Sequence, residues 1–231
     1  MKAVLFDLGN TLVKDTAKGE VVKEIMLKGL WEELSREGIN VTLGGLREAL
    51  NESFREQSRA KGYLEELKVE EVFIKCFNKL GIPCSCHLSK CINAYFGARV
   101  NTVTLYDDVI PTLEKLKSLK LKLGLISNAL PDGKIVYEAL GLNKYFDIAI
   151  FSFEKGVKKP HPQLFEEALD SLGIGAEETI MVGDSLEADV LGARLTGIRA
   201  ILIIRKWLRV SYSIIPDYII TDLRQLLELL S

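Results

Sequence analysis

Phe6-Asp7-Leu8-Gly9-Asn10-Thr11-Leu12 is the stretch of sequence that decides the fold. Residues 2–6 before it are predicted to form a buried strand, which ends at the Asp7 carboxylate and, two residues on, a glycine. In an α/β sheet, ligands bind at the carboxyl ends of the strands. The heptapeptide alone is a moderate signal. It becomes strong because later segments supply the groups that a nucleophilic aspartate needs.

The second half of the chain predicts the sheet to which this first strand belongs. After Tyr106 the sequence alternates between helical spacing and short apolar runs. Runs that are almost continuous in Val, Ile and Leu and are separated by helices are typical of parallel strands buried on both faces. We therefore expect an α/β fold, a doubly wound parallel sheet. The expected strands are 121–126, 146–151, 179–182, 200–204 and 218–220, and the expected helices are 109–119, 134–140, 163–172, 188–196 and a last one capped near Asp222.

Residues 18–99 show helical spacing and no convincing strand. Four successive apolar faces predict four helices that can pack into a small bundle, inserted after the first strand as a lid beside its carboxyl end. We expect an α/β core over residues 1–16 and 102–231, with a four-helix cap over residues 17–101. The predicted faces are Val21, Ile25, Leu27, Leu30, Trp31 and Leu34; Leu46, Leu50 and Phe54; Val69, Val72, Phe73, Cys76, Phe77 and Leu80; and Leu88, Cys91, Ile92, Tyr95 and Phe96.

The composition of the chain gives no reason to expect nucleic acid or a membrane as its partner. The chain has 231 residues, of which 48% are hydrophobic, so it can bury one large core or two small ones. A formal net charge of −2 gives no electrostatic reason to expect nucleic acid or an anionic membrane surface. No apolar run approaches the roughly 20 residues of a membrane span, and the amino terminus lacks the pattern of a secretory signal. We expect a soluble cytoplasmic protein, whose oligomeric state the sequence leaves open.

Four cysteines lie between Cys76 and Cys91. Cys84-Ser85-Cys86-His87, with Cys91 nearby, suggests a zinc site, but the paired spacing of structural zinc sites is missing. Intracellular cysteines are more often small buried hydrophobic residues. Buried thiols are therefore the leading interpretation, with a metal site or a disulfide among Cys84, Cys86 and Cys91 as the alternatives.

Three later segments carry polar side chains that should meet Asp7 at one edge of the sheet. Ser127-Asn128 follows one predicted strand, and Gly183-Asp184-Ser185 follows another, with Asp189 just beyond it. Lys158-Lys159-Pro160-His161-Pro162 precedes a predicted helix. Because the carboxyl ends of parallel strands lie at the same edge, we expect these segments to converge.

These residue types suit the attack of a carboxylate on phosphorus. The repulsion between two anions must be cancelled, and a divalent cation shared by carboxylate and phosphate does this. Mg²⁺ favours one or two carboxylates together with phosphate and water, and Asp7 and Asp184 supply them. Lys159, the Ser127 hydroxyl and the N–H groups of Leu8 and Gly9 would hold the phosphoryl oxygens. Asp7 is then the nucleophile, and water hydrolyses the aspartyl phosphate.

Each segment has a plainer interpretation when taken alone. Ser127 or Asp184 at a strand end is often a helix N-cap, and Lys159 alone would be a solvated charge. Asp189 is better suited to brace its loop or to hold Lys159 than to bind the metal. The plainer interpretations would have to hold at four places in the right order, so a shared site is the better explanation.

The four segments resemble the motifs of the haloacid dehalogenase-like hydrolase superfamily across essentially the whole chain. Asp7-Leu8-Gly9-Asn10-Thr11 matches the first motif, Ser127-Asn128 the second, Lys159-Pro160-His161-Pro162 the third, and Gly183-Asp184-Ser185 to Asp189 the fourth. The resemblance implies a Mg²⁺-dependent aspartyl nucleophile, an α-helical cap after the first motif and, most often, phosphatase activity on small phosphate esters. It also implies that the Gly9 carbonyl binds the metal, that Asn128 belongs to the phosphate site and that Thr11 supports the first motif.

Gly9 departs from the family pattern, which usually has a second aspartate there as general acid and base. Loss of a general acid typically costs about 10²–10⁴ in rate. Some family phosphatases also carry glycine at this position, so activity is still expected. The leaving group would then need little protonation, as in an acyl phosphate, or water or a cap residue would replace the acid. Asp15, Glu20 and Glu24 are nearest in sequence.

Three other functions are alternatives to phosphatase activity. A haloacid dehalogenase shares the nucleophile but needs no metal, which Asp184 argues against, and a mutase would need the missing acid. A catalytically weakened binding or regulatory protein fits Gly9, but not the retention of Asp7, Ser127, Lys159 and Asp184 together. We expect a Mg²⁺-dependent phosphatase acting on a small-molecule phosphate monoester or acyl phosphate.

Overall fold

The structure is a computed structural model that describes residues 1–83, 88–205 and 214–230. The strands are β1 (Ala3–Phe6), β2 (Val13–Asp15), β3 (Val103–Leu105), β4 (Lys122–Ser127), β5 (Ile148–Phe151), β6 (Thr179–Gly183), β7 (Arg199–Ile203) and β8 (Tyr218–Ile220). The α-helices are α1 (Gly19–Arg36), α2 (Leu43–Ala60), α3 (Val69–Lys79), α4 (Leu88–Gly97), α5 (Val109–Ser118), α6 (Pro131–Ala139), α7 (Ser152–Lys155), α8 (Pro162–Leu172), α9 (Leu191–Leu195) and α10 (Gln225–Leu230). Short 3₁₀ helices are η1 (Ala98–Thr102), η2 (Leu142–Lys144) and η3 (Ala176–Glu178), and a π-helical turn, η4 (Leu186–Val190), precedes α9.

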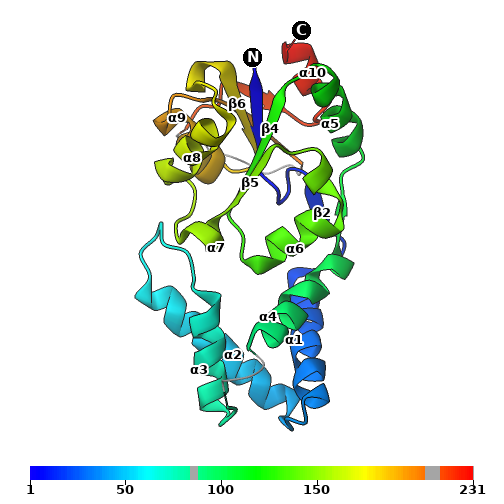
Figure 1. The fold of residues 1–231 in the computed structure, drawn as a ribbon, viewed down its shortest axis with the longest axis vertical. Helices are drawn as coiled ribbons and strands as arrows, with labels where there is room; N and C mark the ends of the chain where they lie inside the picture. Colours follow the sequence, from blue (N-terminus) through cyan, green and yellow to red (C-terminus); the bar gives the residue numbers. More distant parts are fainter. Residues whose placement is uncertain (84–87, 206–213, 231) are drawn as a thin grey trace.

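Six strands form a parallel sheet in the order β5-β4-β1-β6-β7-β8 (Figure 1). β1 lies between β4 and β6, so that Phe6 is opposite Leu125 on one side and Val182 on the other. All neighbouring strands of this sheet are parallel, which confirms the predicted fold class. The register brings the residues that follow β1, β4 and β6 to the same edge.

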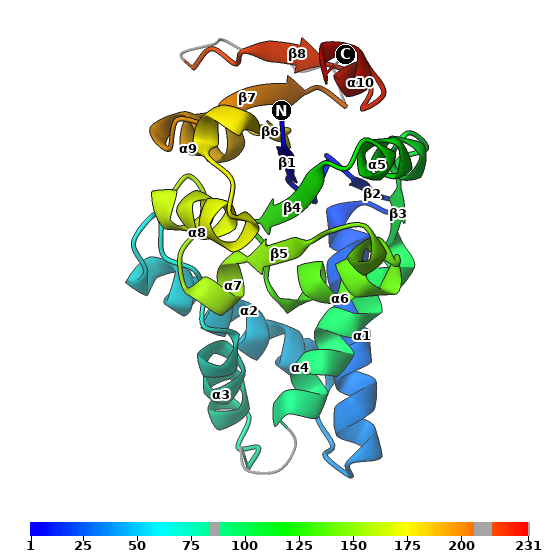
Figure 2. The same ribbon diagram turned by 45° about the horizontal axis from the view of Figure 1, so that its top comes forward.

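Helices cover both faces of the sheet (Figure 2). Alternate residues of β1 point to opposite faces, as strand geometry requires. Val4 and Phe6 belong to a buried cluster with residues of α5, α6 and α10, whereas Leu5 belongs to a second cluster with residues of α8 and α9. Burial on both faces explains why the strands are apolar almost throughout.

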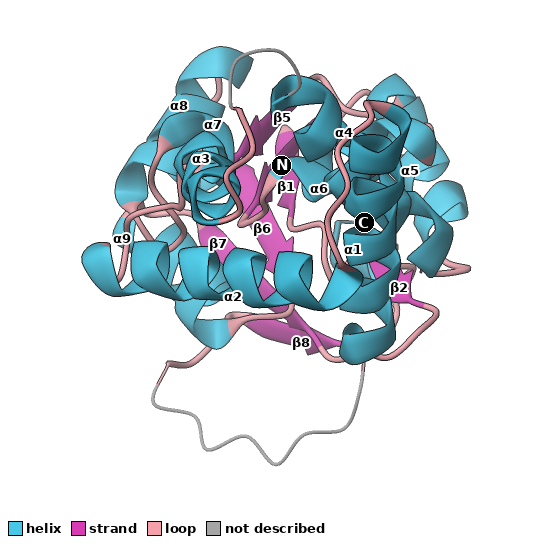
Figure 3. Cartoon of the chain, turned by 90° about the horizontal axis from the view of Figure 1, so that it is seen from below, coloured by secondary structure: helices cyan, strands magenta, loops and turns pink. Residues whose placement is uncertain are grey.

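Helices α1 to α4, here called the helical segment, share a third buried cluster that is separate from the two of the sheet. Seen from below, these helices lie in front of the sheet (Figure 3). The expected faces of α3 and α4 are confirmed. The predicted face of α1 is wrong at Val21 and Trp31, which are 48% and 37% exposed, because the helix turns Val22 and Met26 inward instead. The division of the chain into two domains stays a prediction.

β2 and β3 pair as a two-stranded antiparallel ribbon where the chain leaves and re-enters the sheet region. The ribbon has no signal in the sequence, because three-residue strands are too short to show a period. Another difference concerns the helix expected over 188–196. It begins earlier, as the π-helical turn at Leu186, and only its last part is α-helical.

Cys76 and Cys91 are free thiols buried in the helical segment. Burial raises the pKa of Cys76 to about 12 and that of Cys91 to about 11, so both are inert at neutral pH. Cys84, Cys86 and His87 lie outside the described residues, and the zinc and disulfide alternatives that include them stay predictions. Within the described ranges, the helices are all too short or too polar to cross a bilayer.

Candidate active site

β1 delivers Asp7 to the carboxyl edge of the sheet. The backbone N–H of Asp7 donates to the carbonyl of Val182, 2.9 Å away, so the residue is anchored between β1 and β6. Its side chain is buried. Burial raises the pKa of the Asp7 carboxyl to about 7, and the nearby carboxylates of Asp189 and Asp184 add to this, although the Lys159 charge opposes the shift.

Lys159 is the centre of a buried ion cluster. Its Nζ donates to Oδ1 of Asp7 at 2.7 Å, to Oδ1 of Asp189 at 2.6 Å and to the carbonyl of Ile126 at 2.6 Å. Burial lowers the pKa of Lys159, but the carboxylates of Asp189 and Asp7 outweigh it and leave the pKa raised. The lysine is therefore a cation that neutralises two buried carboxylates.

Asn128 holds the backbone of Lys159 on both sides of its Cα atom. The N–H of Lys159 donates to Oδ1 of Asn128 at 2.7 Å, and Nδ2 of Asn128 donates to the carbonyl of Lys159 at 3.0 Å. The Asn128 side chain therefore holds the loop that carries Lys159, because a residue exposed at a strand end can reach across to the neighbouring loop. Its expected place in the phosphate site stays a prediction.

Asp189 contacts Lys159 through one carboxylate oxygen and its own loop through the other. Its Oδ2 accepts a hydrogen bond from the N–H of Ser185 at 3.0 Å. Gly183 makes this position possible, because a methyl group on Gly183 would lie 2.2 Å from Cγ of Asp189. The need for glycine here has no signal in the sequence, since it depends on a contact between two parts of the folded loop.

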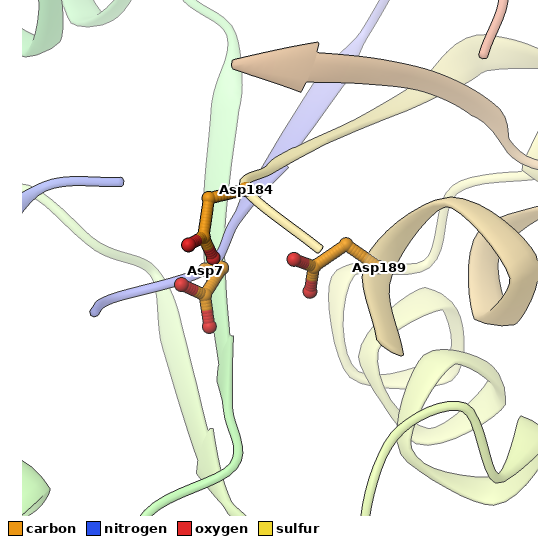
Figure 4. Close-up of side chains that lie close together, drawn as sticks. All are labelled: Asp7, Asp184 and Asp189. Atoms are coloured by element: carbon orange, nitrogen blue, oxygen red, sulfur yellow. The ribbon is translucent and has the colours of Figure 1, made fainter. Parts of the chain in front are cut away.

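Asp184 completes a group of three carboxylates. One carboxylate oxygen from each of Asp7, Asp184 and Asp189 lies within 4.8 Å of the other two (Figure 4). Burial, followed by the charge of Asp189, raises the pKa of Asp184, whereas a hydrogen bond from the Asn10 side chain acts in the opposite direction. Asn10 adopts a left-handed backbone conformation with φ 52°, which asparagine tolerates better than most residues.

The donor set at this edge fits a hard cation such as Mg²⁺, which prefers oxygen ligands. Both oxygens of Asp189 already accept hydrogen bonds, from Lys159 and Ser185. Asp7 accepts from Lys159 through Oδ1, which leaves its second oxygen for a ligand. Asp7 and Asp184 are therefore the better suited pair, and Asp189 is better suited to hold the lysine.

The remaining predicted residues surround this group. Ser127 is buried at the end of β4, Leu8 is buried, and Gly9 is exposed. Within the described ranges, the N–H groups of Leu8 and Gly9 have no hydrogen-bond acceptor, which leaves them for a ligand. A Cβ atom on Gly9 would meet no atom within 4 Å, so the glycine is not required by packing.

Thr11 is held by Arg205, which follows β7. Nη2 of Arg205 donates to the carbonyl of Thr11 at 2.7 Å, and the same guanidinium forms a buried ion pair with Asp108 at 2.6 Å. The ring of Tyr106 lies 4.0 Å from the guanidinium carbon. Nothing in the sequence pattern singled out Arg205, because its partners lie about a hundred or more residues away along the chain.

A cavity of about 610 Å³ opens between the helical segment and the loop that follows Asn128. Asp15, Glu20 and Glu24, the three acids named from the sequence, all line it. Asp132 joins them. Burial raises the pKa of Asp132 to about 6, although the charge of Arg99 opposes the shift.

The sequence model of the haloacid dehalogenase-like hydrolases matches residues 1–197. The chain belongs to the haloacid dehalogenase-like hydrolase family. A glyceraldehyde 3-phosphate phosphatase of Pyrococcus furiosus is 30% identical, over 100% of this chain and 93% of its own length. A phosphoserine phosphatase of Thermus thermophilus is 30% identical, over 97% of each chain.

Solved structures agree with this assignment. This haloacid dehalogenase-like hydrolase is similar to the crystal structure of a phosphatase of the same family from Thermococcus onnurineus, at 28% identity and a TM-score of 0.68, over 100% of this chain and 98% of that one. It is also similar to a 2-haloacid dehalogenase from Pseudomonas syringae, at 29% identity and a TM-score of 0.75, with the same coverage of both chains. The chain is therefore an enzyme of the hydrolase class, and its relatives support a phosphatase.

Proposed function

We propose that this hydrolase is a Mg²⁺-dependent phosphatase that acts on a small phosphate monoester or acyl phosphate, with Asp7 as the nucleophile. The observation that carries the proposal is the contact of Lys159 with both Asp7 and Asp189 beside the Asp184 carboxylate. A cation fixed against one oxygen of Asp7 orients the carboxylate and leaves the other oxygen to attack phosphorus.

In the first step, the free oxygen of Asp7 attacks phosphorus, the bond from phosphorus to the leaving oxygen breaks, and an aspartyl phosphate forms. The Ser127 hydroxyl and the N–H groups of Leu8 and Gly9 bind the phosphoryl oxygens. Lys159 contributes its positive charge beside them, and one of its three hydrogen bonds must be given up if it also donates to the phosphate. Asp7, Asp184 and the carbonyl of Gly9 would hold Mg²⁺, which supplies positive charge against the phosphate when bound. In the second step, water attacks phosphorus, and inorganic phosphate leaves as the Asp7 carboxylate is restored.

The leaving group must obtain its proton without a side chain at position 9. Substrates with an acidic leaving group need this proton least, so they should react best. We predict that Gly9→Asp raises the turnover of alkyl phosphates more than that of aryl phosphates, because a general acid is typically worth about 10²–10⁴ when the leaving group is basic. Because a Cβ atom at position 9 would meet no atom within 4 Å, the substitution should not disturb the packing of the site. An equal effect on both ester classes would contradict the argument.

The helical segment would act as a cap over the site, with boundaries at residues 17 and 101. The cavity that it forms with the loop after Asn128 carries the acidic residues Asp15, Glu20, Glu24 and Asp132. The named relatives act on glyceraldehyde 3-phosphate and phosphoserine, both small phosphorylated metabolites. We infer a substrate of this size in the cytoplasm, with neither nucleic acid nor a membrane as partner.

Dehalogenation is the second candidate, because a structural relative at 29% identity is a 2-haloacid dehalogenase. Both reactions use a carboxylate nucleophile, but displacement of halide from carbon does not need the second carboxylate at Asp184. Halide release from a 2-haloacid therefore separates the two.

Hydrolysis of p-nitrophenyl phosphate with and without Mg²⁺ tests the proposal, with Asp7→Asn as the control. We expect metal-dependent turnover that this substitution abolishes, and no halide release. Turnover that is independent of metal, or that survives Asp7→Asn, would contradict the mechanism. Phosphate-analogue binding without turnover of any metabolite ester would favour a binding protein instead.

A further inference from the structure

The helical segment touches the sheet region on two opposite sides. On one side the chain itself passes between them through the β2–β3 ribbon. On the other, the loop between α2 and α3 (residues 61–68) rises towards α7 (Figure 1). This second contact is not covalent, so it can form and separate, and it lies next to the loop that carries Lys159.

Backbone hydrogen bonds join the two loops in an antiparallel manner. The N–H of Glu66 donates to the carbonyl of Gly156 at 2.9 Å, and the N–H of Lys158 donates to the carbonyl of Leu64 at 2.8 Å. Between them, Glu65 and Val157 form an isolated antiparallel bridge. The bonded stretch therefore ends one residue before Lys159.

The Glu66 side chain then enters the sheet region. Its Oε2 accepts a hydrogen bond from the hydroxyl of Ser152 at 2.5 Å, and its Oε1 accepts from the N–H of Leu67 at 2.9 Å. The Ser152 hydroxyl oxygen in turn accepts from the N–H of Ala129 at 2.9 Å. Ala129 follows Asn128, so one carboxylate from the helical segment reaches the loop of the second motif as well as that of the third.

Packing alone does not account for this carboxylate. Glu66 is 6% exposed and Ser152 is fully buried. Among the residues that the structure describes, Glu66 has neutral hydrogen-bond donors but no cation as an ion-pair partner. Burying a charge in this way is costly, and an apolar side chain would pack there at lower cost. Its position beside two catalytic loops suggests a role in the arrangement of the site.

We propose that Glu66 is a positioning residue, which docks the α2–α3 loop onto the loops that carry Asn128 and Lys159 and so fixes the arrangement of these two residues. The inference rests on the proposed phosphatase function only for its effect on turnover. Asn128 holds the backbone of Lys159, so a shift of either loop moves the Lys159 ammonium relative to Asp7.

The chain offers well-matched variants. Glu66→Ala removes the carboxylate, and Ser152→Ala removes its partner. Glu66→Gln keeps an oxygen for Leu67, and the Ser152 hydroxyl can then donate to the carbonyl of Ala129, which is 3.2 Å away. Glu65→Ala is the control, because Glu65 lies on the same loop with its side chain 56% exposed.

Hydrogen exchange followed by mass spectrometry measures docking without any need for activity. We expect faster exchange in residues 127–131 and 156–159 for Glu66→Ala, Ser152→Ala and the double variant, with Glu65→Ala and Glu66→Gln close to the unaltered protein. Unchanged exchange in Glu66→Ala, or the same increase in Glu65→Ala, would overturn the proposal. If Glu66→Ala does not fold, Ser152→Ala gives the same test from the other side.

Turnover of p-nitrophenyl phosphate gives the functional readout. We expect kcat to fall by about 10–100-fold in Glu66→Ala, the effect typical of small misplacements of catalytic groups, with recovery in Glu66→Gln. The double variant should be no worse than the more impaired single one. Additive losses would contradict a shared contact. If the unaltered protein has no phosphatase turnover, the proposed function fails, and the exchange result still decides whether Glu66 docks the loop.

Discussion

Two groups of buried carboxylates are held in different ways in this molecule. Asp7 and Asp189, at the carboxyl edge of the sheet, share a fully buried ammonium group. Glu66, where the helical segment meets the sheet region, is held by a hydroxyl and a backbone N–H. Charge is therefore balanced by charge in the candidate active site, whereas the carboxylate that docks the α2–α3 loop is held by uncharged donors.

The ion cluster around Lys159 should be a permanent arrangement, whereas the contact of the α2–α3 loop with the sheet region can be reversed. Removing one member of a buried ion cluster leaves the others without compensation, which is strongly destabilising. Hydrogen bonds from a hydroxyl and a backbone N–H, in contrast, can be replaced by hydrogen bonds to water when the loop separates, at a smaller cost. The carboxyl edge of the sheet should therefore tolerate substitution poorly, and the helical segment should tolerate it well except in its apolar interior.

Lys159→Met should have the largest effect, because Asp7 and Asp189 would then lie close together without a counter-charge. We expect the free energy of unfolding at neutral pH to fall by about 3–5 kcal/mol and kcat to fall by at least about 10²-fold. Urea unfolding and steady-state kinetics measure the two. Lys158→Met is the control, since Lys158 is only partly buried and contributes its backbone N–H to the loop contact. A loss of less than about 1 kcal/mol in the free energy of unfolding would mean that the lysine does not compensate the charges of Asp7 and Asp189.

Gly183→Ala should have the next largest effect. The new methyl group would lie 2.2 Å from Cγ of Asp189, so the carboxylate must move away from Lys159. We expect a loss of about 1–3 kcal/mol in the free energy of unfolding, as is usual for overpacking, together with reduced turnover.

Gly44→Ala in α2 is the matched control from the helical segment. A Cβ atom there would meet nothing within 4 Å, so the substitution should stabilise the protein by about 0.4–1 kcal/mol. Urea unfolding of Gly183→Ala and Gly44→Ala should give changes of opposite sign in the free energy of unfolding, which would sharpen the contrast between the regions. A destabilising Gly44→Ala would show that the helical segment is as constrained as the carboxyl edge of the sheet.

The contrast between the regions also explains what the sequence could predict. Apolar strands buried on both faces have a strong local pattern, so the sheet could be predicted. Asp7, Ser127 and Asp184 follow such strands, so their convergence with Lys159 at one edge could be expected from the order of the segments. The faces of α3 and α4 followed from their spacing in the same way. These signals all lie within a few residues along the chain.

Features that depend on distant parts of the chain had no such signal. The β2–β3 ribbon pairs Val13 with Leu105, two strands too short for a period. The engagement of the Asn128 amide by the Lys159 backbone, the need for Gly183 and the contact of Arg205 with Thr11 all depend on loops that meet only after folding. Glu66 lies in a polar loop, where a buried carboxylate cannot be told from an exposed one.

Asp132→Asn tests the boundary between the regions through its pH dependence. Burial raises the pKa of Asp132 from 3.8 to about 6. Between these two pH values the carboxyl is therefore protonated in the folded protein but ionised in the unfolded chain. Stability from this group is present at low pH and is lost as pH rises through 6, where the buried carboxylate becomes charged.

We expect the unfolding free energy of Asp132→Asn, relative to the unaltered protein, to rise by about 1–2 kcal/mol between pH 4 and pH 7. The side chain is 27% exposed, and solvent reduces the effect of the full shift. Urea unfolding at several pH values measures the difference. A difference that does not change with pH, or that falls, would mean that Arg99 compensates the charge in the folded state.

Val21→Ala should have the smallest effect, within about 0.5 kcal/mol of zero, because surface substitutions rarely change stability by more. Val21 is 48% exposed although its spacing had suggested burial, whereas Val22 is 6% exposed. Val22→Ala should cost about 1–2 kcal/mol from lost apolar contacts. Neighbouring valines of one helix differ only in the face they occupy, so urea unfolding of the pair determines how α1 is turned. Equal losses would mean that α1 is rotated towards the face that the sequence predicted, and the cavity between α1, α2 and α4 would then have different walls.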